Sequence, residues 1–382
     1  MKYLCMPADF RPETLEAYAA LNRTASDIRV YETYGNLNPS PFQSGRAIDS
    51  PRLPRVSEQG LREYLETGSR AGIHFNYTLN ASCSGGKEFG PQGLKALFGI
   101  IERLAKLGVQ CVTLTSPAHI CLVHSHWPEI ALCTSVICEI DSVAAVKMFE
   151  DFGASRIIVS EDIHRRFDII HAMRRATALP LEVLTNSTCL FRCPWKPFHY
   201  NLLSHMSTTR QPDIEAYYHW QCMAVRLREP AELLRLRWIR PEDIDLYEDA
   251  TYFKVVGRYF ASDSDLVRVA RAYMERRFDG NLWDLLGNFA PQRRHGVYID
   301  NAALDGFLPW FKASPRHCSD MACRSCDHCK RYAAAAVTGD LAAVRERLGL
   351  SELAQRVSMF HERGRQIGAI DENDTARCAR AF

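Results

Sequence analysis

The chain has 382 residues and a formal net charge of +2, from 47 Lys and Arg against 45 Asp and Glu. Hydrophobic residues make up 47% and charged residues 24%, a balance that excludes disordered, collagen-like and strongly basic nucleic-acid-coating chains. No apolar stretch approaches the ~20 residues that cross a bilayer, and the apolar run at the start is too short for a signal peptide. We therefore expect a soluble, cytoplasmic protein.

Short apolar or β-branched runs recur along the chain, and several precede segments with helical periodicity. The eight expected strands are residues 2–6, 28–34, 72–79, 109–115, 130–135, 156–160, 179–185 and 251–256. Residues 92–107 and 142–153 carry apolar side chains at helical spacing, and Gly153 stands in a helix-stop position. Strands that alternate with helices pair in parallel. Eight units favour a (β/α)8 TIM-like barrel over an open doubly wound sheet, and no G-x-G-x-x-G motif supports a Rossmann fold.

The pattern changes after the eighth strand. Residues 262–277 indicate one helix, residues 296–310 a loosely structured region, and the chain from Tyr332 onward an Ala-rich, charged helical tail. We therefore expect a barrel over residues 1–280, which carries the active site and a first cysteine cluster. Residues 281–382 form a C-terminal extension with a second cysteine cluster.

Cysteine is the abnormal feature of the composition, with 14 residues. In a large protein of a reducing compartment, cysteines are ligands or core residues rather than disulfides. Those expected in the core, because they lie within apolar runs, are Cys111, Cys121, Cys133 and Cys138. Cys5, near the N-terminus, belongs to no visible pattern.

The strongest motif lies in the C-terminal extension. Cys318, Cys323, Cys326 and Cys329 follow one another with four, two and two intervening residues in a polar, turn-rich segment. Such a run supplies a complete tetrathiolate site for zinc or for an iron–sulfur cluster, and the spacing does not separate the two. Four unrelated exposed thiols at this density would oxidise.

A second cysteine group follows the seventh expected strand, on the barrel face where βα loops build active sites. Cys189 and Cys193 form a Cys-x3-Cys-Pro motif, and Cys222 comes before the eighth strand. The motif superficially resembles a radical-SAM loop, but Lys196 replaces the third cysteine. The fourth ligand could be Cys83, which follows the third strand. The alternatives are a non-cysteine ligand or an iron without a fourth protein ligand. The alternative is that these are structural thiols.

Polar residues at the ends of the strands are candidate substrate contacts. Arg258 could bind a carboxylate bidentately, and Asn80 could orient an anionic or amide-bearing substrate. His119 and Glu161 follow the fourth and sixth strands and could serve a hydrolytic reaction, and Asn186 follows the seventh. Each of them alone could equally be a helix cap or a loop hydrogen bond.

Several segments resemble the collagenase-like peptidase family U32, over roughly residues 73–277. The stretch Phe-Lys-Val-Val-Gly-Arg at residues 253–258 is similar to that family's F-K-I-x-G-R element. The resemblance implies a barrel-like fold and a [4Fe–4S] cluster held by four cysteines. It also implies oxygen-independent hydroxylation, as in the paired ubiquinone-pathway proteins and the RNA-hydroxylating relatives. The resemblance implies that Cys189, Cys193 and Cys222 ligate the cluster. It also implies that Arg258 is a substrate-binding or structural arginine.

Three functions remain open. The first is an iron–sulfur enzyme with one or two [4Fe–4S] clusters that modifies a small molecule, peptide or nucleobase by oxygen-independent hydroxylation. The second is a metal-dependent or cysteine peptidase, although no H-E-x-x-H or G-x-S-x-G motif is present. The third is a non-catalytic iron–sulfur subunit of a hetero-complex.

Among partners, the sequence favours a small-molecule or peptide substrate, with a protein partner or a second copy of the chain as alternatives. RNA binding is not indicated by the charge balance, because the Arg-rich runs at 226–240 and 271–277 are typical of solvated helical faces. Zinc is an alternative metal for the C-terminal cysteines, and no membrane contact is expected.

Overall fold

The computed structural model describes residues 1–37, 43–45, 54–207, 215–257, 265–286, 296–313, 318 and 326–350. Eight parallel strands form one sheet in the order β5-β4-β3-β2-β1-β8-β7-β6. They are β1 (Lys2–Pro7), β2 (Ile28–Gly35), β3 (His74–Leu79), β4 (Cys111–Leu114), β5 (Ala131–Thr134), β6 (Ile157–Ile158), β7 (Leu181–Leu184) and β8 (Tyr252–Lys254). No strand extends more than one residue beyond its expected range, so all eight predictions are confirmed.

The two edge strands of this order, β5 and β6, meet through isolated bridges. Cys133 pairs with Arg156, and Ile140 pairs with Val159, both in parallel. The Thr134 amide also donates to the Arg156 carbonyl at 3.0 Å. These contacts bring the sheet to a nearly closed ring, which confirms the (β/α)8 TIM-like barrel and excludes the open doubly wound sheet.

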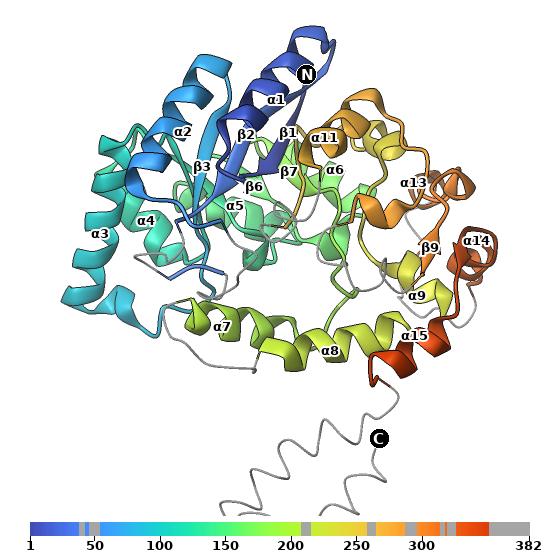
Figure 1. Ribbon diagram of the computed structural model, residues 1–382. Coiled ribbons are helices and arrows are strands. Elements are labelled where there is room, and N and C mark those ends of the chain that lie inside the picture. The colour runs from blue at the N-terminus through green and yellow to red at the C-terminus, as the bar shows by residue number, and fades with distance from the viewer. Residues whose placement is uncertain are drawn as a thin grey trace, which may run out of the picture.

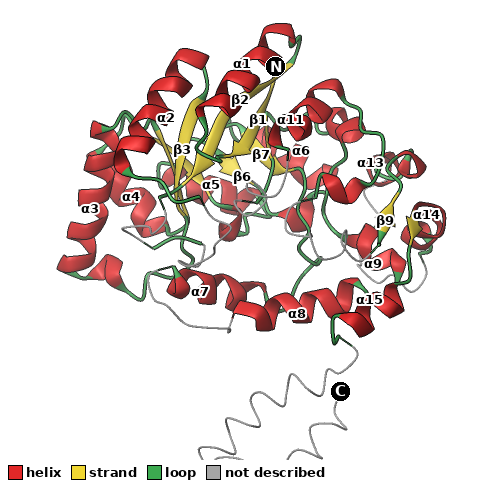
Figure 2. Ribbon diagram, viewed as in Figure 1, coloured by secondary structure: helices red, strands yellow, loops and turns green. Residues whose placement is uncertain are grey.

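Helices surround this ring in the order of the chain (Figures 1 and 2). Those that follow the first six strands are α1 (Pro12–Thr24), α2 (Glu58–Ala71), α3 (Pro91–Lys106), α4 (Pro117–His126), α5 (Val143–Asp151) and α6 (Phe167–Ala176). Ser142 caps the N-terminus of helix α5, and its side chain accepts from the Ala145 amide. The helix is followed by Gly153 at φ +100°, where a Cβ would lie 2.3 Å from the His124 ring. Only glycine fits this position at the end of the helix.

The connection from β7 to β8 is the longest in the barrel and contains α7 (Lys196–Met206), α8 (Glu215–Arg226) and α9 (Pro230–Arg235). Helices α7 and α8 contact each other and cross the end of the barrel toward which the strands run (Figure 1). They therefore cover the C-terminal mouth, where barrels hold their functional groups.

After β8 the chain forms α11 (Leu266–Glu275), inside the helix expected at 262–277. The elements that follow are η5 (Leu282–Asp284), β9 (Tyr298–Ile299), η6 (Ala302–Leu304), α13 (Pro309–Ala313), α14 (His328–Ala336), β10 (Val337–Thr338) and α15 (Leu341–Arg347). Helix α14 packs on α9, and the Phe307 ring lies 5.5 Å from that of Trp238. The described part of the extension thus packs on the β7–β8 connection; the boundary at residue 280 stays a prediction.

The cysteines expected in the core divide into two groups. Cys111 and Cys133 are buried in β4 and β5, as predicted, and Cys138 is half-buried. Cys121 is exposed, so that prediction is wrong. Helix α4 turns Ile120 and Val123 toward the core, and Cys121 lies on another face of the same helix. Within the described parts of the chain, no helix is long and apolar enough to cross a membrane.

Candidate functional site

A buried lysine lies among carboxylates at the C-terminal mouth. The Lys196 ammonium is 3.2 Å from Glu161 Oε1 and 3.0 Å from Asp162 Oδ2. The Ser187 hydroxyl donates to the second oxygen of Glu161. Burial lowers the pKa of Lys196, but Glu161, Cys189 and Asp162 outweigh it, so this pKa lies above its ordinary value. The ammonium therefore stays charged and holds the two carboxylates in place.

The loop with the Cys-x3-Cys motif is fixed by the same carboxylates. Asp162 Oδ1 accepts from the Arg192 amide at 2.9 Å, between the two cysteines of the motif. Ser187 Oγ accepts from the Cys189 amide at 3.4 Å. The ends of β6 and β7 thus set the positions of Cys189 and of the residues leading to Cys193.

Cys189 and Cys193 each lie within electrostatic range of Cys222, but the three sulfur atoms are not all within 4.8 Å of one another. The Cys222 thiol on α8 acts electrostatically on both Cys189 and Cys193. All three are half-buried and none is in a disulfide. Burial, and then Glu161, raise the pKa of Cys189, whereas Lys196 and Arg226 lower it. Three thiols with two buried cations nearby form a donor set suited to a negatively charged metal–thiolate group.

Cys83 lies on a loop that is bound elsewhere. Its neighbour Ser82 bonds to Asn201 at 2.7 Å and to Ser204 at 2.8 Å, in the C-terminal half of α7. Ser204 is eight positions after Lys196, which corresponds to about 12 Å along a helix. The Cys83 sulfur accepts from the Gly85 amide at 3.4 Å. No contact of the described residues joins Cys83 to the three other thiols, so its role as fourth ligand stays a prediction.

Two of the expected substrate contacts form cross-links between loops. Asn80 donates to the Ser135 hydroxyl at 3.3 Å and accepts from the Gly45 amide at 3.2 Å. Asn186 is buried and donates to the carbonyls of Val256 and Leu285, both at 3.1 Å. These bonds hold the ends of the strands together, so a contact with substrate stays a prediction for both residues.

A hydrolytic pair of His119 with Glu161 stays a prediction. His119 is buried at the start of α4, and the carboxylate that acts on it is Glu88, which accepts from Ser84. Burial lowers the pKa of His119 in spite of Glu88. Arg258 lies outside the described residues.

The C-terminal cysteines are described in part. Cys318, Cys326 and Cys329 are half-buried, with Cys329 in the first turn of α14, and Cys323 lies outside the described residues. Cys318 and Cys329 act electrostatically on the buried Arg165 and Arg237. These cysteines are therefore joined to the barrel through its basic side chains.

The barrel interior holds another cluster with metal-like spacing. One ligand atom each of Cys5, Glu32 and Glu182 lies within 4.8 Å of the others. However, Arg156 is 2.7 Å from Glu32 and 3.2 Å from Glu182, and Lys254 is 3.4 Å from Glu182. Two carboxylates and two cations already neutralise each other, so we interpret this cluster as an ion-pair network of the core.

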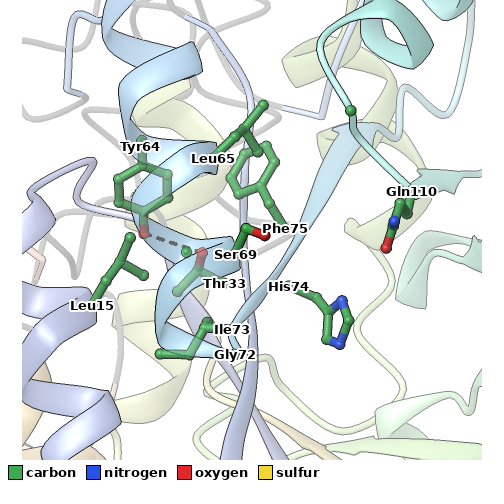
Figure 3. Close-up of a pocket in the computed structure, with 12 residues that line it drawn as sticks. Leu15, Thr33, Tyr64, Leu65, Ser69, Gly72, Ile73, His74, Phe75 and Gln110 are labelled. Carbon is green, nitrogen blue, oxygen red and sulfur yellow. Dashed lines mark hydrogen bonds between the residues drawn. The ribbon is translucent and has the colours of Figure 1, made fainter.

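A pocket of about 220 Å³ lies beside α2 and the start of β3 (Figure 3). Its polar lining includes His74, Gln110 and Thr33, and Thr33 accepts from the Tyr64 hydroxyl at 3.1 Å. His74 begins β3 and Gln110 precedes β4, so the pocket opens near the N-terminal ends of the strands. That end of a barrel supports stability rather than chemistry.

The sequence analysis missed three charged residues of the mouth. In the sequence, Lys196 stands out only because it occupies the position of a third cysteine, and no motif singles out Asp162. Arg226 was placed in a solvated Arg-rich face, yet it is buried beside Cys189. A useful signal was present at Lys196, which directly follows the Cys-x3-Cys-Pro-Trp stretch.

Fold and site together define a (β/α)8-barrel protein with thiols, carboxylates and cations at its C-terminal mouth, where barrel enzymes hold their substrates. The sequence model for peptidase family U32 matches residues 54–209. An uncharacterized protease of Methanocaldococcus jannaschii is 30% identical over 296 residues, which span 77% of this chain and 85% of that protein. The chain belongs to peptidase family U32.

Two solved structures are similar in fold. A U32 peptidase has 17% sequence identity and a TM-score of 0.49, covering 66% of this chain and 92% of that chain. A D-psicose 3-epimerase, determined in the presence of D-fructose, has 12% identity and a TM-score of 0.38, covering 72% of this chain and 96% of that chain. The family assignment rests on the sequence matches.

Proposed function

We propose that the chain is an iron–sulfur enzyme of family U32 that binds a [4Fe–4S] cluster through Cys189, Cys193 and Cys222. Its reaction would be an oxygen-independent modification, such as hydroxylation, of a small-molecule, peptide or nucleobase substrate. The observation that carries the proposal is the gathering of three unpaired thiols around two buried cations at the barrel mouth.

The donor set fits such a cluster in number and in charge. Thiolates are the ordinary ligands of iron–sulfur clusters, and a cluster core of charge +2 with three thiolates carries a net charge of −1. The buried Arg226 supplies positive charge beside Cys189, whereas the Lys196 ammonium is already paired with Glu161 and Asp162. When bound, such a cluster supplies one-electron transfer and, at an iron without a cysteine ligand, Lewis acidity.

The surrounding residues act by positioning. Asp162 holds the Arg192 amide and so fixes the loop between Cys189 and Cys193. Lys196 fixes Asp162 and Glu161 in turn. Hydrogen bonds and charges of this kind around a metal site orient its ligands and tune its potential. The charged groups of the mouth are thus fixed by hydrogen bonds and ion pairs before any substrate enters.

Peptide hydrolysis is the second candidate, and the name of the M. jannaschii relative favours it. A cysteine nucleophile needs a lowered pKa, whereas burial and Glu161 raise that of Cys189. A lysine general base also needs a lowered pKa, whereas Lys196 has a raised one. These pKa directions oppose a cysteine or Ser–Lys peptidase at the mouth, but they do not favour the cluster, because a thiol that ligates a metal must also lose its proton.

The test is to purify the full chain without oxygen and to measure iron, acid-labile sulfide and the visible spectrum. Single substitutions Cys189→Ser, Cys193→Ser and Cys222→Ser should each remove most of the barrel iron and its absorption. Cys121→Ser is the matched control, because that thiol is exposed on α4. Cys83→Ser decides whether Cys83 is the fourth ligand.

The opposite result is equally clear. A chain that takes up no iron, or whose iron is unchanged by all three substitutions, would contradict the proposal. Metal-free protein that cleaves peptides, and loses this activity in one Ser or Cys variant, would establish the peptidase instead. Activity that appears only after addition of a second protein would favour the non-catalytic subunit.

A further inference from the structure

Two arginines are buried beside the C-terminal cysteines without a salt bridge among the described residues, although the Asp162 carboxylate acts electrostatically on Arg237. Arg165 and Arg237 are each 3% exposed, and no salt bridge to either is found among the described residues. Arg165 donates to the carbonyls of Leu234 at 2.6 Å and Leu236 at 2.7 Å. A buried cation is costly unless a negative charge compensates it, so an anion is expected here.

Two thiols and Tyr247 act electrostatically on both guanidinium groups, and Asp162 acts on that of Arg237. Arg165 forms a side-chain hydrogen bond with Cys329, and Cys318 and Cys329 both act electrostatically on Arg165 and Arg237. Cys329 lies in the first turn of α14, where the helix dipole favours a thiolate. Cys318 and Cys329 both pack against the hydrophobic core.

Aromatic rings enclose the same region. The Arg165 guanidinium lies 4.9 Å from the Phe307 ring and 4.8 Å from the Phe311 ring. His328, next to Cys329, is stacked 4.0 Å from Trp310, and its Nε2 donates to the Phe307 carbonyl at 3.0 Å. These rings restrict water, which strengthens any electrostatic interaction inside the enclosure.

We propose that Cys318, Cys326 and Cys329 are thiolate ligands of a second metal centre, zinc or iron–sulfur, whose negative charge Arg165 and Arg237 balance. A zinc ion or a [4Fe–4S] core has a charge of +2. With three thiolates the centre carries −1 and is stabilised by both cations. This inference does not depend on the cluster proposed at the barrel mouth.

The experiment isolates this centre by removing the other one. The full chain with Cys189→Ser, Cys193→Ser and Cys222→Ser is purified without oxygen, and zinc and iron per chain are measured. We expect one zinc, or iron with matching sulfide, to remain, and the element found identifies the centre. Adding Cys326→Ser and Cys329→Ser should remove it.

Arg237→Met in the same background should weaken metal retention against a chelator by about 10- to 100-fold, the usual cost of losing a group that supports metal ligands. Arg237→Lys keeps the charge and should retain the metal, and Arg277→Met, with a side chain 75% exposed, is the control. Far-UV circular dichroism checks that each variant is folded. Cys326→Ser and Cys329→Ser are also introduced into the chain with intact barrel cysteines. The metal content per chain should then fall by one centre.

Two results would overturn the inference. One is a folded chain that loses no zinc or iron on substitution of Cys326 and Cys329, in either background. The other is an Arg237→Met variant that retains metal as well as Arg237→Lys, which would remove the charge-balancing role. If the barrel mouth binds no iron while the C-terminal centre remains, the proposed function fails and this inference stands.

Discussion

The guanidinium carbon of Arg237 lies 3.6 Å from the centroid of the Phe191 ring. Phe191 belongs to the loop between Cys189 and Cys193, whereas Arg237 faces Cys318 and Cys329 from the β7–β8 connection. The contact between Arg237 and Phe191 therefore links the two cysteine groups. A movement of Arg237 would displace the ring that supports the Cys-x3-Cys loop.

Phe191→Leu should lower the free energy of unfolding by about 1–2 kcal/mol, because it removes a ring that interacts with a buried cation. Phe191→Tyr keeps the ring and should remain within about 0.5 kcal/mol of the parent. Urea unfolding of both variants measures the difference. Equal stability of the Leu and Tyr variants would show that the contact contributes only apolar area.

Lys196→Met should be among the most destabilising changes at the mouth. It leaves Glu161 and Asp162 buried without their cation, and breaking a buried pair in this way costs about 3–5 kcal/mol. Lys196→Arg keeps the charge and should lose less. Chemical denaturation at pH 7 compares the two, and a Met variant as stable as the Arg variant would contradict the assigned role.

The pH dependence of Lys196 follows from its raised pKa. Its stabilising contribution is complete below the pKa of a lysine in the unfolded chain, about 10.4, and is lost as the pH rises through the higher folded value. The parent chain should thus lose this stability only in alkaline solution. The Met variant should lack that alkaline loss.

The strands could be predicted because each is a compact run of apolar residues followed by a polar turn. Thus β4, with Cys111, Val112 and Leu114, and β7, with Val183, are recognisable without any tertiary information. The barrel then follows from the alternation with helices. Cys121 was misplaced because α4 is apolar on more than one face, so the sequence did not show which face is buried.

The charged part of the site could not be predicted in the same way. Lys196 and Asp162 are 34 positions apart, and only the return of the chain from β7 over the mouth brings them to 3.0 Å. Arg237 and Phe191 meet for the same reason. Spacing identifies cysteine ligands that are close in sequence, but a compensating charge can come from any strand end of the barrel.

His164 should make the fold sensitive to mild acid. Burial lowers its pKa from 6.5 to about 4, and its Nδ1 contacts the Arg237 carbonyl at 3.2 Å. The unfolded chain binds the proton more readily, so stability is complete above pH ~6.5 and falls as the pH drops toward 4, by about 3 kcal/mol.

His164→Gln removes this titration and should flatten the stability profile between pH 4 and 6.5. His171→Gln, at a side chain that is 60% exposed and 3.1 Å from Asp249, is the matched substitution with which the His164 variant is compared. Urea midpoints at several pH values measure both. A parent profile that is already flat in this range would refute the buried neutral histidine.

Arg156→Met should cost about 3–5 kcal/mol, because it leaves Glu32 and Glu182 in the core with only Lys254 to balance them. Burial raises the pKa of Glu32, but Arg156 and Lys254 outweigh it and lower this pKa. The parent therefore holds this stability above the unfolded glutamate pKa of about 4.3 and loses it as the pH falls through the folded value.

The same variant distinguishes an ion-pair network from a metal site in the barrel interior. If Cys5, Glu32 and Glu182 bound a metal, removal of the nearby Arg156 cation would strengthen binding, and added zinc would restore the lost stability. We expect no recovery with zinc. Glu32→Gln combined with Arg156→Met should instead recover part of the loss, because it removes one unpaired carboxylate together with its cation.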